Sequence, residues 1–223
     1  MQEKKQEQDA STQFRWEMRD DCMDNHTLTM NYAKQNDIDT FQFPVNITQL
    51  VATGDYVQTF RIPEGVKRAC ITFMALRNLH VPDSVESLNC SYNCLESLEV
   101  PASIRILDVS NNHCMRKLYF RGQGQPTDLV DLDISETRIE SLDFPPPPNL
   151  EHLNINRSYV FESLMPKEWQ DALAPMELDL EDGYYKVGET VLSSFHWNRV
   201  DWDEDEENDE EHQENVEKTY IRP

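Results

Sequence analysis

The chain is poor in basic residues. Lys and Arg number 20 against 42 Asp and Glu, which leaves a formal net charge of −22. Nucleic acid and anionic membranes are bound through Lys and Arg, so neither is expected as a direct partner. A basic protein would be attracted by such a field, whereas a second interpretation of the same acidity is that it only keeps the protein in solution.

Long apolar runs and a disulfide framework are also missing. No apolar stretch approaches the roughly 20 residues of a membrane span, and the opening MQEKKQEQD lacks the apolar core of a signal peptide. The five cysteines are odd in number and scattered, unlike a disulfide framework. We therefore expect an intracellular protein of the cytoplasm or nucleus, or of the host cytoplasm if another kind of signal exports it.

What the sequence does contain is a repeat. The stretch Val85–Pro101, VESLNCSYNCLESLEVP, has apolar residues at positions 4, 6, 11, 14 and 16, Asn at position 9 and Pro at position 17, counting Val85 as position 1. Copies begin at Leu28, Ile47, Val66, Val85, Ile104, Leu129 and Leu150. A recurring unit of this length indicates a solenoid, in which each repeat buries its apolar face against its neighbours.

Each position of the repeat predicts a role. Apolar residues at positions 4 and 6 predict a short strand, and successive strands should stack in parallel on a concave face. Asn at position 9 can bond the backbone of the neighbouring turn; Asn36, Asn93 and Asn112 occupy it, and Met74 predicts a gap. The regular proline predicts an extended or polyproline-like convex side without helices. Cys114 falls on core position 11.

The flanking segments differ in composition from the repeats. Phe14, Met18 and Cys22 recur at four-residue steps and predict a helix. After the last repeat, Trp169 and Leu173 have the same spacing and predict a short helix over 167–173. Between 201 and 217 there are 11 acidic residues and no Lys or Arg. The predicted organisation is a disordered tail over 1–10, a helical cap over 11–27, seven repeats over 28–166, a C-terminal cap over 167–200 and an acidic disordered tail over 201–223.

The stretch Ile104–Asn112, IRILDVSNN, resembles the leucine-rich repeat. The short unit ending in Val-Pro or Ile-Pro is most similar to the repeats of secreted bacterial effectors that act inside host cells. The resemblance covers about 60% of the chain and implies a leucine-rich repeat solenoid that binds proteins. Such effectors often carry a ubiquitin-ligase domain with a cysteine nucleophile, but the 57 residues after Pro166 contain no Cys. Repeats followed by an acidic tail are also similar to acidic nuclear proteins that bind histones.

No arrangement of residues predicts catalysis. The six His residues are scattered, and the glycines at 122 and 124 are not followed by the Lys-Ser/Thr of a phosphate loop. We expect neither a cofactor nor a metal, and an enzyme within 174–200 is only a third hypothesis. The outward positions of the predicted strands, 3, 5, 7 and 8 of each repeat, instead predict a partner-binding surface on the concave face. Its candidate residues are Arg68, Thr72, Phe73, Ser87, Asn89, Tyr92, Asp108, Asp131, Asp133, His152 and Asn154. We expect the protein to be a monomer.

Two functions compete on this basis. The first is a non-enzymatic adaptor or host-directed effector that binds a protein partner on the concave face. The alternative is a binder or chaperone of basic proteins such as histones, which would act through the acidic tail. Deleting 201–217 separates the two, because only the second predicts loss of binding and of its salt dependence.

Overall fold

The computed structural model describes residues 13–20, 26–123, 125–160, 165–179 and 184–186. Residues 1–190 form one compact unit and 191–223 a second, and none of the second unit is described. The predicted tails over 1–10 and 201–223 therefore lie outside the described residues. So do parts of both predicted caps.

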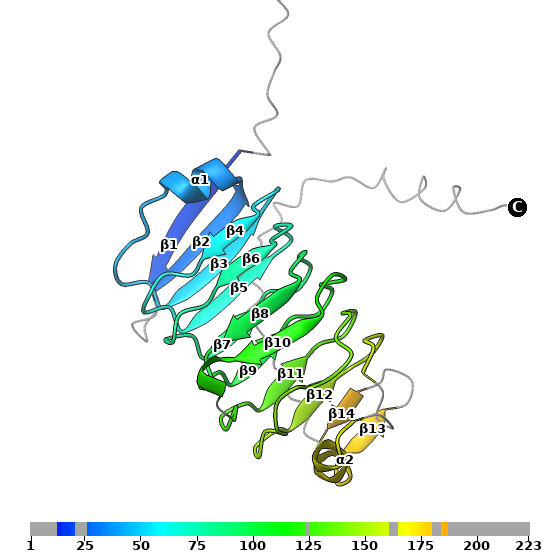
Figure 1. The fold of residues 1–223 in the computed structure, drawn as a ribbon. Coiled ribbons are helices and arrows are strands. Elements are labelled where there is room, and N and C mark those ends of the chain that lie inside the picture. The colour runs from blue at the N-terminus through cyan, green and yellow to red at the C-terminus, as the bar shows by residue number, and fades with distance from the viewer. Residues whose placement is uncertain (1–12, 21–25, 124, 161–164, 180–183, 187–223) are drawn as a thin grey trace, which may run out of the picture. The chain divides into compact units, whose positions relative to one another are not determined.

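A sheet of ten strands carries the fold (Figure 1), in the order β1-β2-β3-β5-β7-β9-β11-β12-β14-β13. Its parallel strands are β2 (His26–Ala33), β3 (Gln49–Gly54), β5 (Arg68–Thr72), β7 (Ser87–Asn89), β9 (Ile106–Asp108), β11 (Asp131–Asp133) and β12 (His152–Asn154). Each belongs to one predicted repeat, and the chain makes about six turns between the first and the last. The repeat prediction is confirmed at this level: the described chain is a β-solenoid with few helices.

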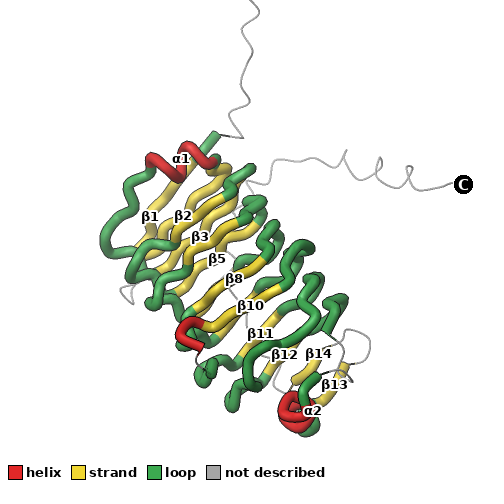
Figure 2. Tube along the Cα trace, viewed as in Figure 1, coloured by secondary structure: helices red, strands yellow, loops and turns green. Residues whose placement is uncertain are grey.

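The other side of the turns also consists of extended segments. The strands β4 (Thr59–Arg61) and β6 (Asn78–His80) form one parallel pair, and β8 (Ser97–Val100) and β10 (Lys117–Phe120) form another. A short 3-10 segment, η2 (Arg121–Gln123), follows β10. Figure 2 shows loops connecting these pairs to the main sheet. Buried residues from both sides, such as Leu88 and Leu98, join one apolar core.

The N-terminal segment is a strand, not the predicted helix. Strand β1 (Arg15–Asp20) pairs antiparallel with β2. Phe14 and Met18 fit a four-residue helical step, but with Trp16 between them they also fit the two-residue period of a strand. Phe14 and Trp16 contact Phe41 edge-on, with ring centroids 6.0 and 5.6 Å apart. The strand pairs with backbone groups of β2 that would otherwise form an open sheet edge.

At the other end, helix α2 (Lys167–Leu173) has the predicted bounds. Trp169 and Leu173 are buried, and the Trp169 indole Nε1 donates a hydrogen bond of 2.8 Å to the carbonyl oxygen of Phe144. Two more strands follow: β14 (Tyr184–Lys186) pairs antiparallel with β12 and with β13 (Glu177–Asp179).

The first repeat is longer than its pattern predicted. Leu28 lies beside Leu50 in the sheet and so occupies position 4, three places later than expected. The additional residues form an irregularity between Met30 and Ala33 and helix α1 (Gln35–Thr40). Asn36 is therefore exposed on a helix and is not part of the Asn ladder. A fixed spacing could not show that extra residues had been absorbed by a bulge and a helical turn.

The Asn ladder exists in the middle repeats. The Asn93 carboxamide accepts hydrogen bonds of 3.1 Å from the amides of Met74 and Leu76, and it donates to Ile71 O at 2.7 Å and Cys90 O at 3.0 Å. Asn112 repeats the arrangement one turn on, accepting from Leu95 N and donating to Cys90 O. Each side chain thus joins two turns.

The repeat pattern predicted Met74 correctly and Cys114 wrongly. Met74 is fully buried, and because its side chain has no donor it interrupts the ladder, as predicted. Cys114 is exposed, and Met115 is fully buried in its place. The register of the fifth repeat slips by one residue before Cys114, so its prediction as a core residue was wrong.

Candidate functional site

The predicted binding residues lie on one face of the main sheet and in the turns that follow its strands. We call the residues at positions 3, 5 and 7 of the repeats the polar face. Arg68 is exposed, whereas Ser87, Asn89, Asp133 and Asn154 are half-buried. The remaining sheet members, Thr72, Asp108, Asp131 and His152, are buried. The accessible part of the predicted surface is therefore narrower than the pattern suggested.

The polar face has a structural role of its own. In four repeats the side-chain oxygen at position 5 accepts a hydrogen bond of 2.8–3.0 Å from the backbone amide at position 7, which turns the chain at the end of the strand. The pairs are Asn89 with Ser91, Asp108 with Ser110, Asp133 with Ser135, and Asn154 with Asn156. Asn and Asp recur at position 5 because both types supply this acceptor.

Three of the predicted residues form an acidic group on adjacent strands. Asp108 and Asp133 are direct neighbours across β9 and β11. Burial, followed by the nearby charge of Asp133, raises the pKa of Asp108 to about 6, although hydrogen bonds from Ser110 oppose the shift. Burial also raises the pKa of Asp133, which accepts a hydrogen bond of 3.0 Å from Asn154 Nδ2. Asp131, the third member, lies beside His152 in the next strand.

Phe73 and Tyr92 are brought together in the turns. They occupy position 8 of consecutive repeats, and their rings are stacked, with centroids 4.5 Å apart and planes 16° from parallel. Phe73 is 61% exposed and Tyr92 50%. Both have a φ of +55°, in the left-handed region that bulky side chains avoid.

Two further aromatic residues belong with this pair, and the sequence prediction missed both. Tyr32 is 43% exposed at a φ of +55°, and Tyr56 is 82% exposed at +59°. Tyr32 is the last but one residue of β2, and Tyr56 lies two residues after the end of β3. Parallel strands end at the same edge of a sheet. We call Tyr32, Tyr56, Phe73 and Tyr92 the aromatic edge. The corrected register of the first repeat, which places Tyr32 at position 8, would have revealed the first of them.

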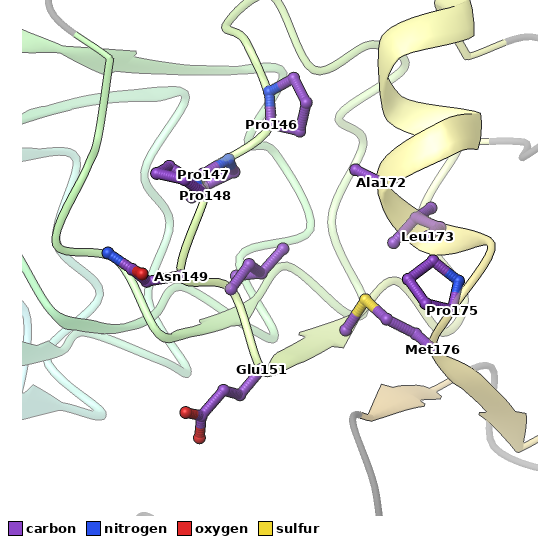
Figure 3. Close-up of a pocket in the computed structure, with 10 residues that line it drawn as sticks. Pro146, Pro147, Pro148, Asn149, Glu151, Ala172, Leu173, Pro175 and Met176 are labelled. Atoms are coloured by element: carbon purple, nitrogen blue, oxygen red, sulfur yellow. The ribbon is translucent and has the colours of Figure 1, made fainter.

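A cavity of about 580 Å³ lies between the proline run and the C-terminal cap. Its walls include Pro146 and Pro148 on one side and Leu173 and Met176 on the other (Figure 3). The one charged lining residue, Glu151, points away from the others in this view. The cavity can accept an apolar group, but its lining brings together no nucleophile and base.

The described part of the chain contains neither a group of side chains that could hold a metal ion nor a helix that could span a membrane. Within it, no three His, Cys, Asp or Glu side chains are placed to hold a metal ion. No helix there has the length and apolar character that crossing a bilayer requires. Of the cysteines that the structure describes, Cys90 packs in the core, and burial raises the pKa of its thiol well above the usual value.

Comparison of the chain with protein-family models, with curated proteins and with solved structures finds no match. The leucine-rich repeat resemblance therefore stays a prediction, carried by the residues of the repeat.

Proposed function

We propose that the chain is a non-enzymatic protein-binding module of the leucine-rich repeat type, an adaptor or a host-directed effector. Its contact surface is centred on Phe73 and Tyr92 and extends over the accessible part of the polar face. The solenoid supplies a rigid support, since the hydrogen bonds of Asn93 and Asn112 tie the neighbouring turns together.

The observation that carries this proposal is the conformation of the aromatic pair. Left-handed backbone costs a non-glycine residue roughly 1–2 kcal/mol, and Gly or Asn would be the residue of least cost. The chain instead has Phe73 and Tyr92 there, which are 61% and 50% exposed. Stacking of the two rings stabilises the pair by about 0.5–1.5 kcal/mol, which offsets part of this cost. Aromatic side chains displayed in this way are the kind that anchor protein interfaces.

Double substitution of Phe73 and Tyr92 by Ala tests the proposal. A partner is first captured with the wild-type chain and its affinity measured by calorimetry. The double variant should bind at least about tenfold more weakly, a loss of more than about 1.4 kcal/mol. Tyr119→Ala, which removes a 44% exposed ring from β10, is the matched control. Unchanged affinity of a folded double variant would refute the assignment.

The acidic tail supports a second candidate, a binder or chaperone of basic proteins such as histones. The net charge of −22 and the 11 acidic residues between 201 and 217 favour it. Deleting 201–217 should then abolish binding to core histones together with its salt dependence, whereas binding through the aromatic pair should survive the deletion.

A further inference from the structure

We propose that the aromatic edge recognises an extended, basic peptide segment of a protein partner, whose Arg side chains stack on Tyr32, Tyr56, Phe73 and Tyr92. The inference rests on the proposed function and adds the chemistry of the partner. It joins two candidate residues with two that no pattern had singled out.

The aromatic edge is confined to the first four repeats. At position 8, where Tyr32, Phe73 and Tyr92 are left-handed, the last three repeats have Asn111, Glu136 and Arg157. Tyr56 is left-handed two places later, at position 10, where the third repeat has Ala75. Arg157 and Glu136 pair with each other at 2.7 Å, so in the sixth and seventh turns this position is occupied by a surface ion pair. At position 8 the same backbone geometry thus carries exposed rings in the first, third and fourth repeats and polar side chains in the last three. Because polar side chains also occupy position 8, the fold does not require the rings of the first, third and fourth repeats there.

The dimensions of the edge suit a short extended peptide. Neighbouring turns of a β-sheet lie about 4.8 Å apart, so four turns span about 14 Å, which is the length of roughly four to five extended residues. In an extended chain every second side chain points the same way. Two or three side chains of the partner can therefore face the rings at once.

Charge selects Arg among the side chains that stack on rings. The faces of aromatic rings attract cations, and Arg is the cation found most often against them. Asp55, exposed and adjacent to Tyr56 in the chain, adds a carboxylate beside the edge. The net charge of −22 draws a basic segment toward the protein and repels an acidic one. A purely apolar segment would use the rings but gain nothing from the charge.

A fluorescein-labelled peptide, Ser-Arg-Ser-Arg-Ser-Arg-Ser, tests the inference by fluorescence polarisation with the full chain. Matched peptides carry Lys or the neutral isostere citrulline in place of Arg. We expect the Arg peptide to bind more tightly than the Lys peptide and the citrulline peptide to bind least. The double variant Phe73→Leu/Tyr92→Leu keeps apolar bulk without ring faces and should weaken the Arg peptide by roughly fivefold or more. Tyr119→Leu is the control and should change nothing.

The controls separate this inference from non-specific attraction and from the proposed function. Deleting 201–217 should lower the affinity of the Arg and Lys peptides alike and leave their ratio intact. Equal binding of the Arg and citrulline peptides, or equal loss in the Tyr119→Leu variant, would overturn the cation proposal. If the Leu variant keeps full affinity for the captured protein partner while the Ala variant loses it, the surface is correct and the basic chemistry is wrong. If neither variant loses affinity, both proposals fail. If the double variant does not fold, Tyr56→Leu tests the same inference at another ring, and it should also weaken the Arg peptide.

Discussion

Replacing Asp108 by Asn should make the protein more stable at neutral pH. Burial and the charge of Asp133 raise the pKa of Asp108 from 3.8 to about 6. Each pKa unit corresponds to about 1.4 kcal/mol, so keeping this carboxylate ionised in the folded state costs about 3 kcal/mol. Asn removes the charge and keeps the oxygen that accepts the hydrogen bond of 2.8 Å from Ser110 N.

The chain itself shows that Asn is compatible with this position. Asn89 and Asn154 occupy position 5 of their own repeats and accept the equivalent hydrogen bond at 2.9 and 3.0 Å. The new amide group must also find an acceptor. Asn154 donates to Asp133 of the preceding repeat, and Asn at position 108 can do the same toward Asn89 or Asp133. We therefore expect a gain of about 2–3 kcal/mol at pH 7.

The pH dependence gives the sharper test. Because the folded-state pKa is raised, the folded protein binds this proton more tightly than the unfolded chain does. The stability that the carboxyl contributes is complete below about pH 3.8 and is lost as the pH rises through about 6. Asp108→Asn should remove this decline in the free energy of unfolding between about pH 4 and 6. Urea unfolding followed by circular dichroism at a series of pH values measures it. Asp55→Asn, the same charge change at an exposed site, should shift stability by less than about 0.5 kcal/mol. A variant with lower stability at pH 7, or with the wild-type slope between pH 4 and 6, would refute the reasoning.

Two further substitutions test what holds the turns together. Asn93→Ala leaves buried backbone groups of two repeats without their hydrogen-bond partner and should lower the free energy of unfolding by about 3 kcal/mol, measured by urea titration; a loss below about 1 kcal/mol would contradict the ladder. Gly54→Ala would place a Cβ against the carbonyl oxygen of Ala33 and should cost more than about 2 kcal/mol by thermal unfolding. Gly122→Ala, with open space around it and a φ of +72°, should cost only about 1 kcal/mol, and an equal effect at both glycines would count against the close packing.

The middle of the fold could be predicted from the sequence because there the spacing is regular. Leu88 and Leu107 lie opposite each other at position 4, and Asn93 joins the turns as its position indicated. The stack depends on a repeated contact between neighbours, and such a contact leaves a repeated pattern. The predicted helix at 167–173 also depended on local spacing alone.

The ends and irregular turns could not be predicted, since each departs from the period. A three-residue difference in the first repeat moved Asn36 onto a helix, and one extra residue moved Cys114 to the surface. Phe14 and Met18 fit both a helix and a strand, and only pairing with β2 decides between them.

Within the candidate site, the sequence singled out Phe73 and Tyr92, and the structure shows both exposed and stacked on each other. Their stacking could not be predicted from the spacing alone. Burial of Asp131 and His152 depends on neighbouring strands, which the spacing of one repeat does not describe.

The antiparallel pairing at both ends of the solenoid has a consequence for association between copies. From β2 to β12 each strand of the main sheet runs parallel to the next, so a bare strand at either end of this series would offer the geometry that another copy could continue. Strand β1 and the β14–β13 hairpin run against the strands they cover. The outermost strand at each end therefore no longer presents the edge geometry that the repeats use among themselves. We expect this reversal to disfavour end-to-end stacking of copies, because a second copy could not continue the parallel pairing of the repeats.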